Sequence, residues 1–92
     1  MVEKIHDLID EMWEELEDAE EYADKGMECN DPAYKSAYFA MAHDELHHFE
    51  KLGEMLKEHH NVGEEMKKYI DLSHASMLKK HAYIKFLISN AK

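Results

Sequence analysis

The 92-residue sequence contains only one cysteine, one proline and three glycines. A single cysteine excludes an internal disulfide and is typical of a reducing compartment, so we expect a cytoplasmic protein. Proline and glycine interrupt regular structure more often than other residues, so their scarcity predicts long, uninterrupted elements. No apolar run approaches the length of a membrane span, and we expect neither a transmembrane segment nor a signal peptide.

Basic residues are scarce relative to acidic ones, with 11 against 21 and a net charge of −10. Nucleic acids and anionic membrane surfaces select basic patches, so we expect neither as a partner. The acidic balance suits cations instead. A chain of this length buries only a modest core, and without a disulfide its usual additional sources of stability are metal binding and oligomerisation.

Helix-forming residues dominate what remains, and 35% of the chain is charged. Asp31 is suited to be an N-cap with Pro32 at the first helical position, and Gly26 and the segment 61–63 are the other breaks. The fold class is therefore predicted to be all-α, an antiparallel helical hairpin plus a third helix in a single domain, 1–92. The expected helices span about 2–27, 32–60 and 64–89.

Apolar residues recur every three or four positions in each expected helix, which predicts one buried stripe per helix. The remaining faces carry the charges, and most of these acids belong to solvated surfaces. The three stripes are Ile5, Leu8, Ile9, Met12, Leu16, Ala19 and Ala23; Tyr34, Tyr38, Met41, Ala42, Phe49, Leu52 and Leu56; and Met66, Ile70, Met77, Ile84 and Leu87 or Ile88.

Three polar residues interrupt these stripes. Glu15 falls within the first stripe, and Glu45 and His48 fall one turn apart within the second. A carboxylate that faces a core is costly unless it is paired or binds metal. Glu15 lies 15 residues before position 30 and Glu45 lies 15 residues after it, so an antiparallel hairpin that turns there places them opposite each other. Two carboxylates with an imidazole are the donor set of a di-iron or di-manganese carboxylate centre.

The Glu-x-x-His pattern alone is weak, because about one such pair is expected by chance from the composition, and two occur. We discard Glu3 with His6, because no acid is expected opposite that pair. The Glu45 and His48 pair is the stronger candidate, because both residues are expected to face inward and Glu45 is expected to lie level with Glu15. The alternative is that Glu45 and His48 lie at a bundle edge with their polar ends in water.

Residues 5–56 resemble the ferritin-like superfamily, especially rubrerythrin-like proteins and encapsulated ferritins. The resemblance rests on Glu15 followed seven residues later by Tyr22, on Glu45-Leu46-His47-His48 thirty residues after Glu15, and on Tyr38-x-x-x-Ala42-x-x-Glu45. It implies Glu15, Glu45 and His48 as metal ligands and Tyr22 as a hydroxyl beside them. A full ferritin-like chain has two such helix pairs, whereas this chain has one.

A complete di-metal bundle needs a Glu from each of two helices and a Glu-x-x-His from each of two others. One chain supplies half of that set, so we expect a homodimer or a larger even homo-oligomer. Iron is the expected metal, with manganese or zinc as alternatives. The resemblance implies iron oxidation with oxygen or peroxide, or iron handling. The competing interpretation is a helical interaction or assembly protein that keeps the fold without metal chemistry.

Other polar residues admit simpler interpretations. Tyr22 and Tyr38 are expected to lie level with each other, either as core tyrosines or as groups that tune or gate electrons. His43 and His47 have zinc-compatible spacing, but their face also carries Glu50 and is expected to be solvated. His74 and His81 are seven residues apart and are either boundary histidines of the core or outer ligands that line an entry path.

Overall fold

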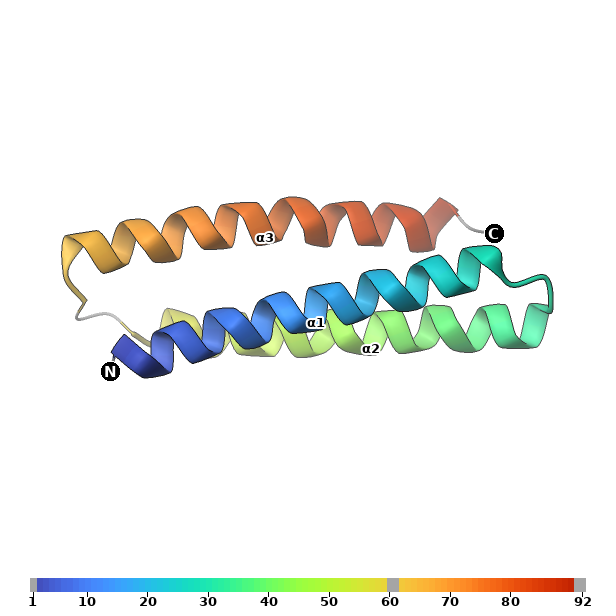
Figure 1. Ribbon diagram of the computed structural model, residues 1–92, viewed down its shortest axis with the longest axis horizontal. Helices are drawn as coiled ribbons and strands as arrows, with labels where there is room; N and C mark the ends of the chain where they lie inside the picture. Colours follow the sequence, from blue (N-terminus) through green and yellow to red (C-terminus); the bar gives the residue numbers. More distant parts are fainter. Residues whose placement is uncertain (1, 60–61, 91–92) are drawn as a thin grey trace.

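The structure, a computed structural model, describes residues 2–59 and 62–90. It contains three α-helices in the described part of the chain, and that part contains no strand. They are α1 (Val2–Glu28), α2 (Pro32–Lys57) and α3 (Glu64–Asn90). The all-α class with three helices is therefore confirmed, and Figure 1 shows the helices running side by side along the long axis of the molecule.

A short connection joins α1 to α2 and fixes the hairpin. The Asp31 carboxylate accepts hydrogen bonds from the backbone N–H groups of Ala33, at 2.9 Å, and Tyr34, at 3.3 Å. These two bonds satisfy donors that the first turn of a helix would otherwise leave free. Pro32 occupies the start of α2, where its missing N–H costs nothing. The expected N-terminus of the second helix is confirmed.

Two helix ends differ from expectation. The second helix was expected to reach residue 60, but α2 ends at Lys57 because the N–H groups of Glu58 and His59 donate to carbonyls three residues back, which tightens the last turn. Residue 60 lies outside the described part. Gly26 does not end α1, which continues to Glu28. A Cβ on Gly26 would lie 2.8 Å from Phe39, so this glycine permits close contact between α1 and α2.

The core lies mainly along α1. The expected α1 stripe is confirmed in full, and each of its members is buried. In α2 the expectation was partly wrong, since Tyr34 and Met41 are exposed while Leu46 is buried. The stripe of α2 that packs inward is rotated towards Ala42, Leu46, Phe49, Gly53 and Leu56. Tyr34 and Met41 therefore lie beside the core stripe and leave apolar surface uncovered.

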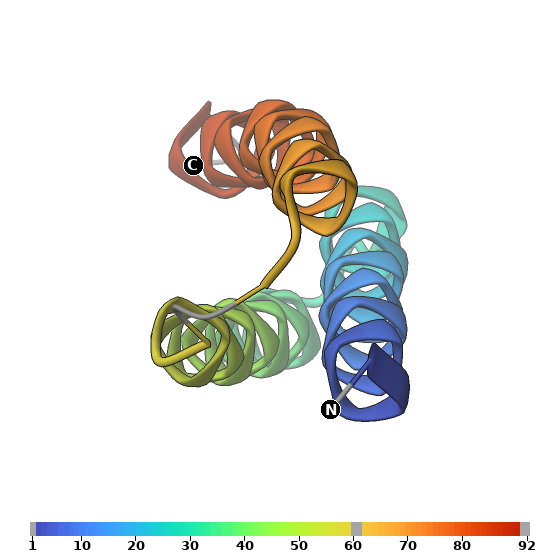
Figure 2. The same cartoon turned by 90° about the vertical axis from the view of Figure 1, so that its left-hand side faces the viewer.

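The third helix packs on the other side of α1 from the site described below. Lys80 of α3 forms a 3.0 Å ion pair with Glu20 of α1, and the rings of Tyr69 and His6 are 5.0 Å apart. Figure 2 shows the three helices from one end, with α1 beside both α2 and α3. Met77 and Ile84 are the fully buried side chains that α3 contributes.

The molecule is elongated, with extents of 50 × 18 × 15 Å and a radius of gyration of 15.0 Å. A compact globule of this length would have a radius of gyration of about 12 Å. Two cavities of about 410 and 400 Å³ lie between α2 and α3 and share Gly53, Lys57 and His74 in their walls. None of the described helices has an apolar stretch that meets the requirements of a membrane span.

Candidate metal centre

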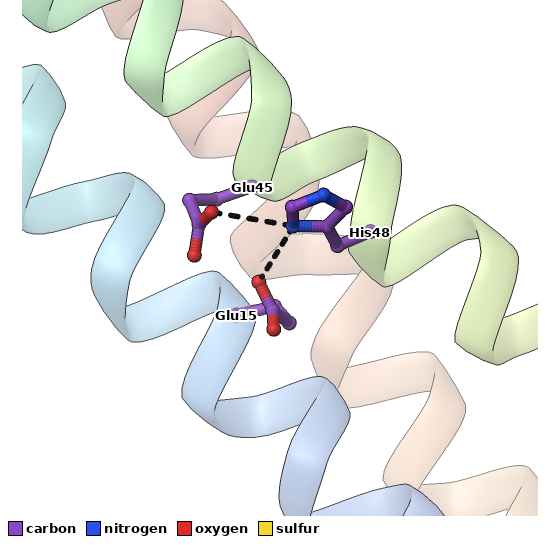
Figure 3. A network of polar contacts seen from close by, with 3 residues as sticks. All are labelled: Glu15, Glu45 and His48. Atoms are coloured by element: carbon purple, nitrogen blue, oxygen red, sulfur yellow. Dashed lines mark ion pairs between the residues drawn. The ribbon is translucent and has the colours of Figure 1, made fainter.

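Glu15, Glu45 and His48 come together across the hairpin (Figure 3). His48 Nδ1 lies 3.3 Å from Glu45 Oε1 and 3.4 Å from Glu15 Oε2. One donor atom from each residue lies within 4.8 Å of the other two. Among the described residues, this is the one group of three or more histidine, cysteine or carboxylate side chains that meets this distance. The expected opposition of Glu15 and Glu45 is confirmed.

Helix geometry explains the convergence. Glu45 and His48 are three residues apart on α2, so their side chains share one face and adjacent turns. Glu15 lies near the middle of α1, at the level that the short hairpin connection sets. Two rigid helices therefore hold the three donors, and no loop residue is needed to position them.

The site lies at the border of the core and opens to solvent. The exposed fractions of the side chains are 25% for Glu15, 19% for Glu45 and 55% for His48. The sequence placed these residues within the buried stripes; Glu15 and Glu45 are half-buried, and the prediction was wrong for His48, which is exposed. The cause is the rotation of α2, which turns Leu46 and Phe49 inward and moves Glu45 and His48 to one side.

Burial and the neighbouring carboxylate perturb Glu15. Loss of hydration is the largest effect that raises the pKa of the Glu15 carboxyl, followed by the contact with Glu45, while His48 opposes the rise. Glu15 Oε2 is itself buried, and among the described residues it contacts His48 Nδ1 at 3.4 Å as an ion pair but accepts no well-formed hydrogen bond. Such an oxygen is costly unless a proton or a cation compensates it.

Asp18 is an exposed acid that lies outside the Glu15, Glu45 and His48 group but is affected by the charge of Glu45, and the sequence reasoning did not single it out. Its pKa is raised, first by loss of hydration and then by repulsion from Glu45, Glu21 and Glu17. Asp18 lies one turn beyond Glu15 on α1, and the three-residue spacing is the signal that could have identified it. The surroundings of the site are therefore more acidic than the three expected residues alone would make them.

The donor set fits a small divalent cation. Two ligands that each lie about 2.1 Å from one ion in tetrahedral geometry are about 3.4 Å from each other. The two separations from His48 Nδ1 match that value, and the ion would also compensate the buried charge on Glu15 Oε2. Carboxylate oxygens with one imidazole nitrogen suit iron, manganese or zinc. Three protein ligands from one chain leave coordination positions open.

The other candidate residues lie apart from this group. Tyr22 and Tyr38 are half-buried. His43 and His47 are exposed, as expected, with ring centres 6.2 Å apart. His81 is a boundary residue that stacks on Phe49 at 5.2 Å and approaches Glu50 at 3.7 Å.

Neither His74 nor His81 belongs to the Glu15, Glu45 and His48 group, and both line the cavity between α2 and α3. Comparisons of the chain with family models, with curated proteins and with solved structures find no match.

Proposed function

We propose that the protein is a ferritin-like di-iron carboxylate protein whose metal centre is completed by a second copy of the chain. The observation that carries this proposal is the convergence of Glu15, Glu45 and His48 on one small volume, with Glu15 Oε2 buried and paired only with His48 among the described residues. A bound cation would compensate that oxygen. Manganese is the alternative metal for the same donor set.

The position of the site supports completion by a partner. Glu45 and His48 lie in a second stripe of α2 that repeats at alternating intervals of three and four residues, which is the spacing of a coiled-coil seam. Three apolar members of this stripe are exposed, with exposed fractions of 66% for Tyr34, 37% for Met41 and 50% for Met55. A second helix pair packed on this stripe would bury these side chains and enclose the site.

Twofold symmetry would supply the remaining ligands. Two copies of the chain bring two Glu15, two Glu45 and two His48 side chains to one axis, which is the ligand set of a di-metal helical bundle. The dimer would also bury apolar surface that a chain of this size cannot cover alone. The packing of two copies about a twofold axis would therefore both assemble the protein and complete the metal centre.

The chemistry follows from this ligand set. Iron held by Glu15, Glu45 and His48 would supply electrons to oxygen or peroxide as it passed from the ferrous to the ferric state. The carboxylates of Glu15 and Glu45 would hold the positive charge, and their ability to accept protons would buffer metal loading and release. His48, the most exposed of the three residues, lies at the solvent side of the site.

Metal content and mass together test this proposal. Protein purified without chelator from iron-rich medium should contain about one metal ion per chain, and light scattering should give roughly twice the chain mass of 10.9 kDa. A metal-free protein with the same dimer would favour the alternative of a helical assembly module that keeps the fold without metal chemistry. A metal-free monomer would overturn both the proposed metal centre and the proposed dimer, and would leave the alternative of a helical interaction protein.

A further inference from the structure

A second group of metal-ligating side chains lies between α2 and α3. The cavity of about 400 Å³ that separates these helices is lined by two glutamates of α2 and two histidines of α3, namely Glu50, Glu54, His74 and His81. None of the four belongs to the candidate metal centre described above. Carboxylate oxygens and imidazole nitrogens are ligands of divalent transition metals, so this cavity has the chemistry of a further cation site.

The His81 imidazole is held in place with an unsatisfied nitrogen near α2. Its side chain is 14% exposed, and its ring stacks on Phe49 of α2 with the ring centres 5.2 Å apart. His81 Nε2 is buried and lies 3.7 Å from Glu50 Oε2, which is too long for a hydrogen bond, and no described residue hydrogen-bonds to it. A buried polar atom without a partner is costly, and a bound ion would compensate it.

The distance between His81 Nε2 and Glu50 Oε2 fits a shared cation. Two ligands that each lie about 2.1 Å from one tetrahedral ion are about 3.4 Å apart, so a shift of about 0.3 Å would place both atoms on the same ion. The Glu50 side chain is 49% exposed and has room to make that shift. Burial lowers the pKa of His81, so its imidazole is neutral at neutral pH and has a lone pair to offer a metal.

Glu54 is suited to be the third ligand. It is exposed, lies one turn after Glu50 on the same face of α2 and lines the same cavity. Its carboxylate is not within 4.8 Å of both other donors, and a rotation of this exposed side chain would bring it to the ion. His74 is two turns from His81, about 10.5 Å along α3, and is too distant to share the ion. Two carboxylates then balance the charge of one divalent cation.

This group is separate from the candidate metal centre. At 100° per residue, Glu50 is rotated about 140° from Glu45 and about 160° from His48 on α2, so one ion cannot contact both faces. The candidate centre joins α1 to α2, whereas an ion at Glu50 and His81 would join α2 to α3.

Two lysines set the expected strength of the site. Lys57 lines the same cavity, and Lys85 lies one turn beyond His81 on α3. Neither belongs to the ion pairs of the described residues, so both positive charges oppose a cation. With two donors in place and two lysines nearby, the site should bind metal more weakly than the candidate centre.

We propose that His81, Glu50 and Glu54 form a second site for a divalent transition-metal ion, such as zinc or ferrous iron, that bridges α2 and α3. This inference is independent of the proposed function, because it uses none of the same residues. The ion would fasten the third helix to the hairpin across a cavity that side chains leave open.

Calorimetric titration with zinc tests this proposal in the Glu45→Ala, His48→Ala double variant, in which the candidate centre has lost two ligands. We expect the double variant to bind about one zinc ion per chain. His81→Gln and Glu50→Gln, each added to the double variant, should weaken this binding about tenfold or more. Zinc should also raise the melting temperature of the double variant, and Glu50→Gln should remove most of that rise.

His43→Gln is the matched control, since His43 is an exposed histidine of α2 that does not line the cavity, and it should leave zinc binding unchanged. Circular dichroism checks that each variant keeps its helical content, and the half-exposed Glu50 is the site least coupled to folding. The proposal is overturned if the double variant binds no zinc, or if Glu50→Gln and His81→Gln bind it equally well. Loss of binding with His43→Gln would also overturn it, because that result assigns the ion to His43 and His47.

Discussion

Glu15 of α1 and His48 of α2 meet across the hairpin, with Oε2 and Nδ1 3.4 Å apart. The contact joins two helices that are otherwise held together by apolar packing. Glu45 approaches the same imidazole nitrogen at 3.3 Å, so one nitrogen faces two carboxylates. This relationship gives the candidate site both its geometry and its excess of negative charge.

Substitution of the site residues should weaken metal binding selectively. We expect Glu45→Ala and His48→Ala each to weaken binding of ferrous or zinc ions by about tenfold or more, because each removes a direct ligand. Glu3→Ala and His6→Ala remove the other Glu-x-x-His pair and are the matched controls, with unchanged binding. Calorimetric titration of apo protein measures all four. Equal losses for both pairs would mean that the wrong motif was identified.

The exposed apolar side chains beside the site should hold the dimer together. We expect Met41→Glu to shift the protein towards monomer, because a charge in the centre of an apolar interface is costly to bury. Met27→Glu is the matched control, since Met27 is similarly exposed but lies outside the seam. Sedimentation velocity over a range of concentrations distinguishes the two variants. A stable monomer for the parent protein would contradict the proposed assembly.

In metal-free protein, the site should be a weak point of the fold near neutral pH. The pKa of Glu15 is raised by burial and by Glu45, so its ionised form is disfavoured in the folded state. The protonated Glu15 carboxyl therefore stabilises the folded state. This contribution to the free energy of unfolding is fully present below the unfolded-state pKa of Glu15 and is lost as the pH rises through its folded-state pKa. Glu15→Gln should therefore leave the apo protein as stable as the parent, or more stable, at pH 7.

Thermal melts test this expectation. For the parent, metal at a hundredfold excess over its dissociation constant should add about 2.7 kcal/mol to the free energy of unfolding, because the ion binds the folded form. The Glu15→Gln variant should gain much less. If Glu15→Gln melts several degrees lower than the parent, and metal does not shift the parent, the carboxylate serves stability and the metal site is wrong.

His81 should make the packing of α3 sensitive to acid. Burial, followed by repulsion from Lys85, lowers the pKa of His81 below its ordinary value of 6.5, and Glu50 only partly opposes this. The unfolded chain then binds the proton at His81 more readily than the folded chain does. The contribution of neutral His81 to the free energy of unfolding is therefore fully present above the unfolded-state pKa and is lost as the pH falls through the folded-state pKa. Melting temperatures between pH 7.5 and pH 5 should fall less for His81→Gln than for the parent. The same fall in both would exclude His81 as the cause.

Equivalent leucine truncations should report which side chains the core covers. Leu46→Ala should lower the free energy of unfolding by roughly 2–5 kcal/mol, because Leu46 is 1% exposed and its removal leaves a cavity. Leu72→Ala makes the same chemical change at a side chain that is 71% exposed and should cost below about 1 kcal/mol. Denaturant unfolding measures both. Similar costs would contradict the observed core.

The sequence predicted α1 and the hairpin well for a physical reason. The apolar residues of α1 form a single stripe against a strongly acidic background, so only one orientation buries them. The Asp31-Pro32 pair marks the start of α2 by its cap geometry. With both helices and the turn located, the opposition of Glu15 and Glu45 follows from equal rise along each helix.

The orientation of α2 and of α3 was harder to predict, because each has apolar residues on more than one side. In α2, the buried Leu46 and the exposed Met41 fit stripes of equal quality in the sequence, and contact with α1 selects between them. In α3, Met77 is buried while Phe86 on the opposite side is exposed. Periodicity identifies such stripes but does not decide which one the fold covers.

X-ray diffraction from an iron-soaked crystal, with data collected on either side of the iron absorption edge, tests the central claim most directly. We expect anomalous density between two chains related by a twofold axis, within about 2.2 Å of Glu15, Glu45 and His48 side chains from both copies. Density confined to other residues, or no density at this site in a crystal that has taken up iron elsewhere, would contradict it.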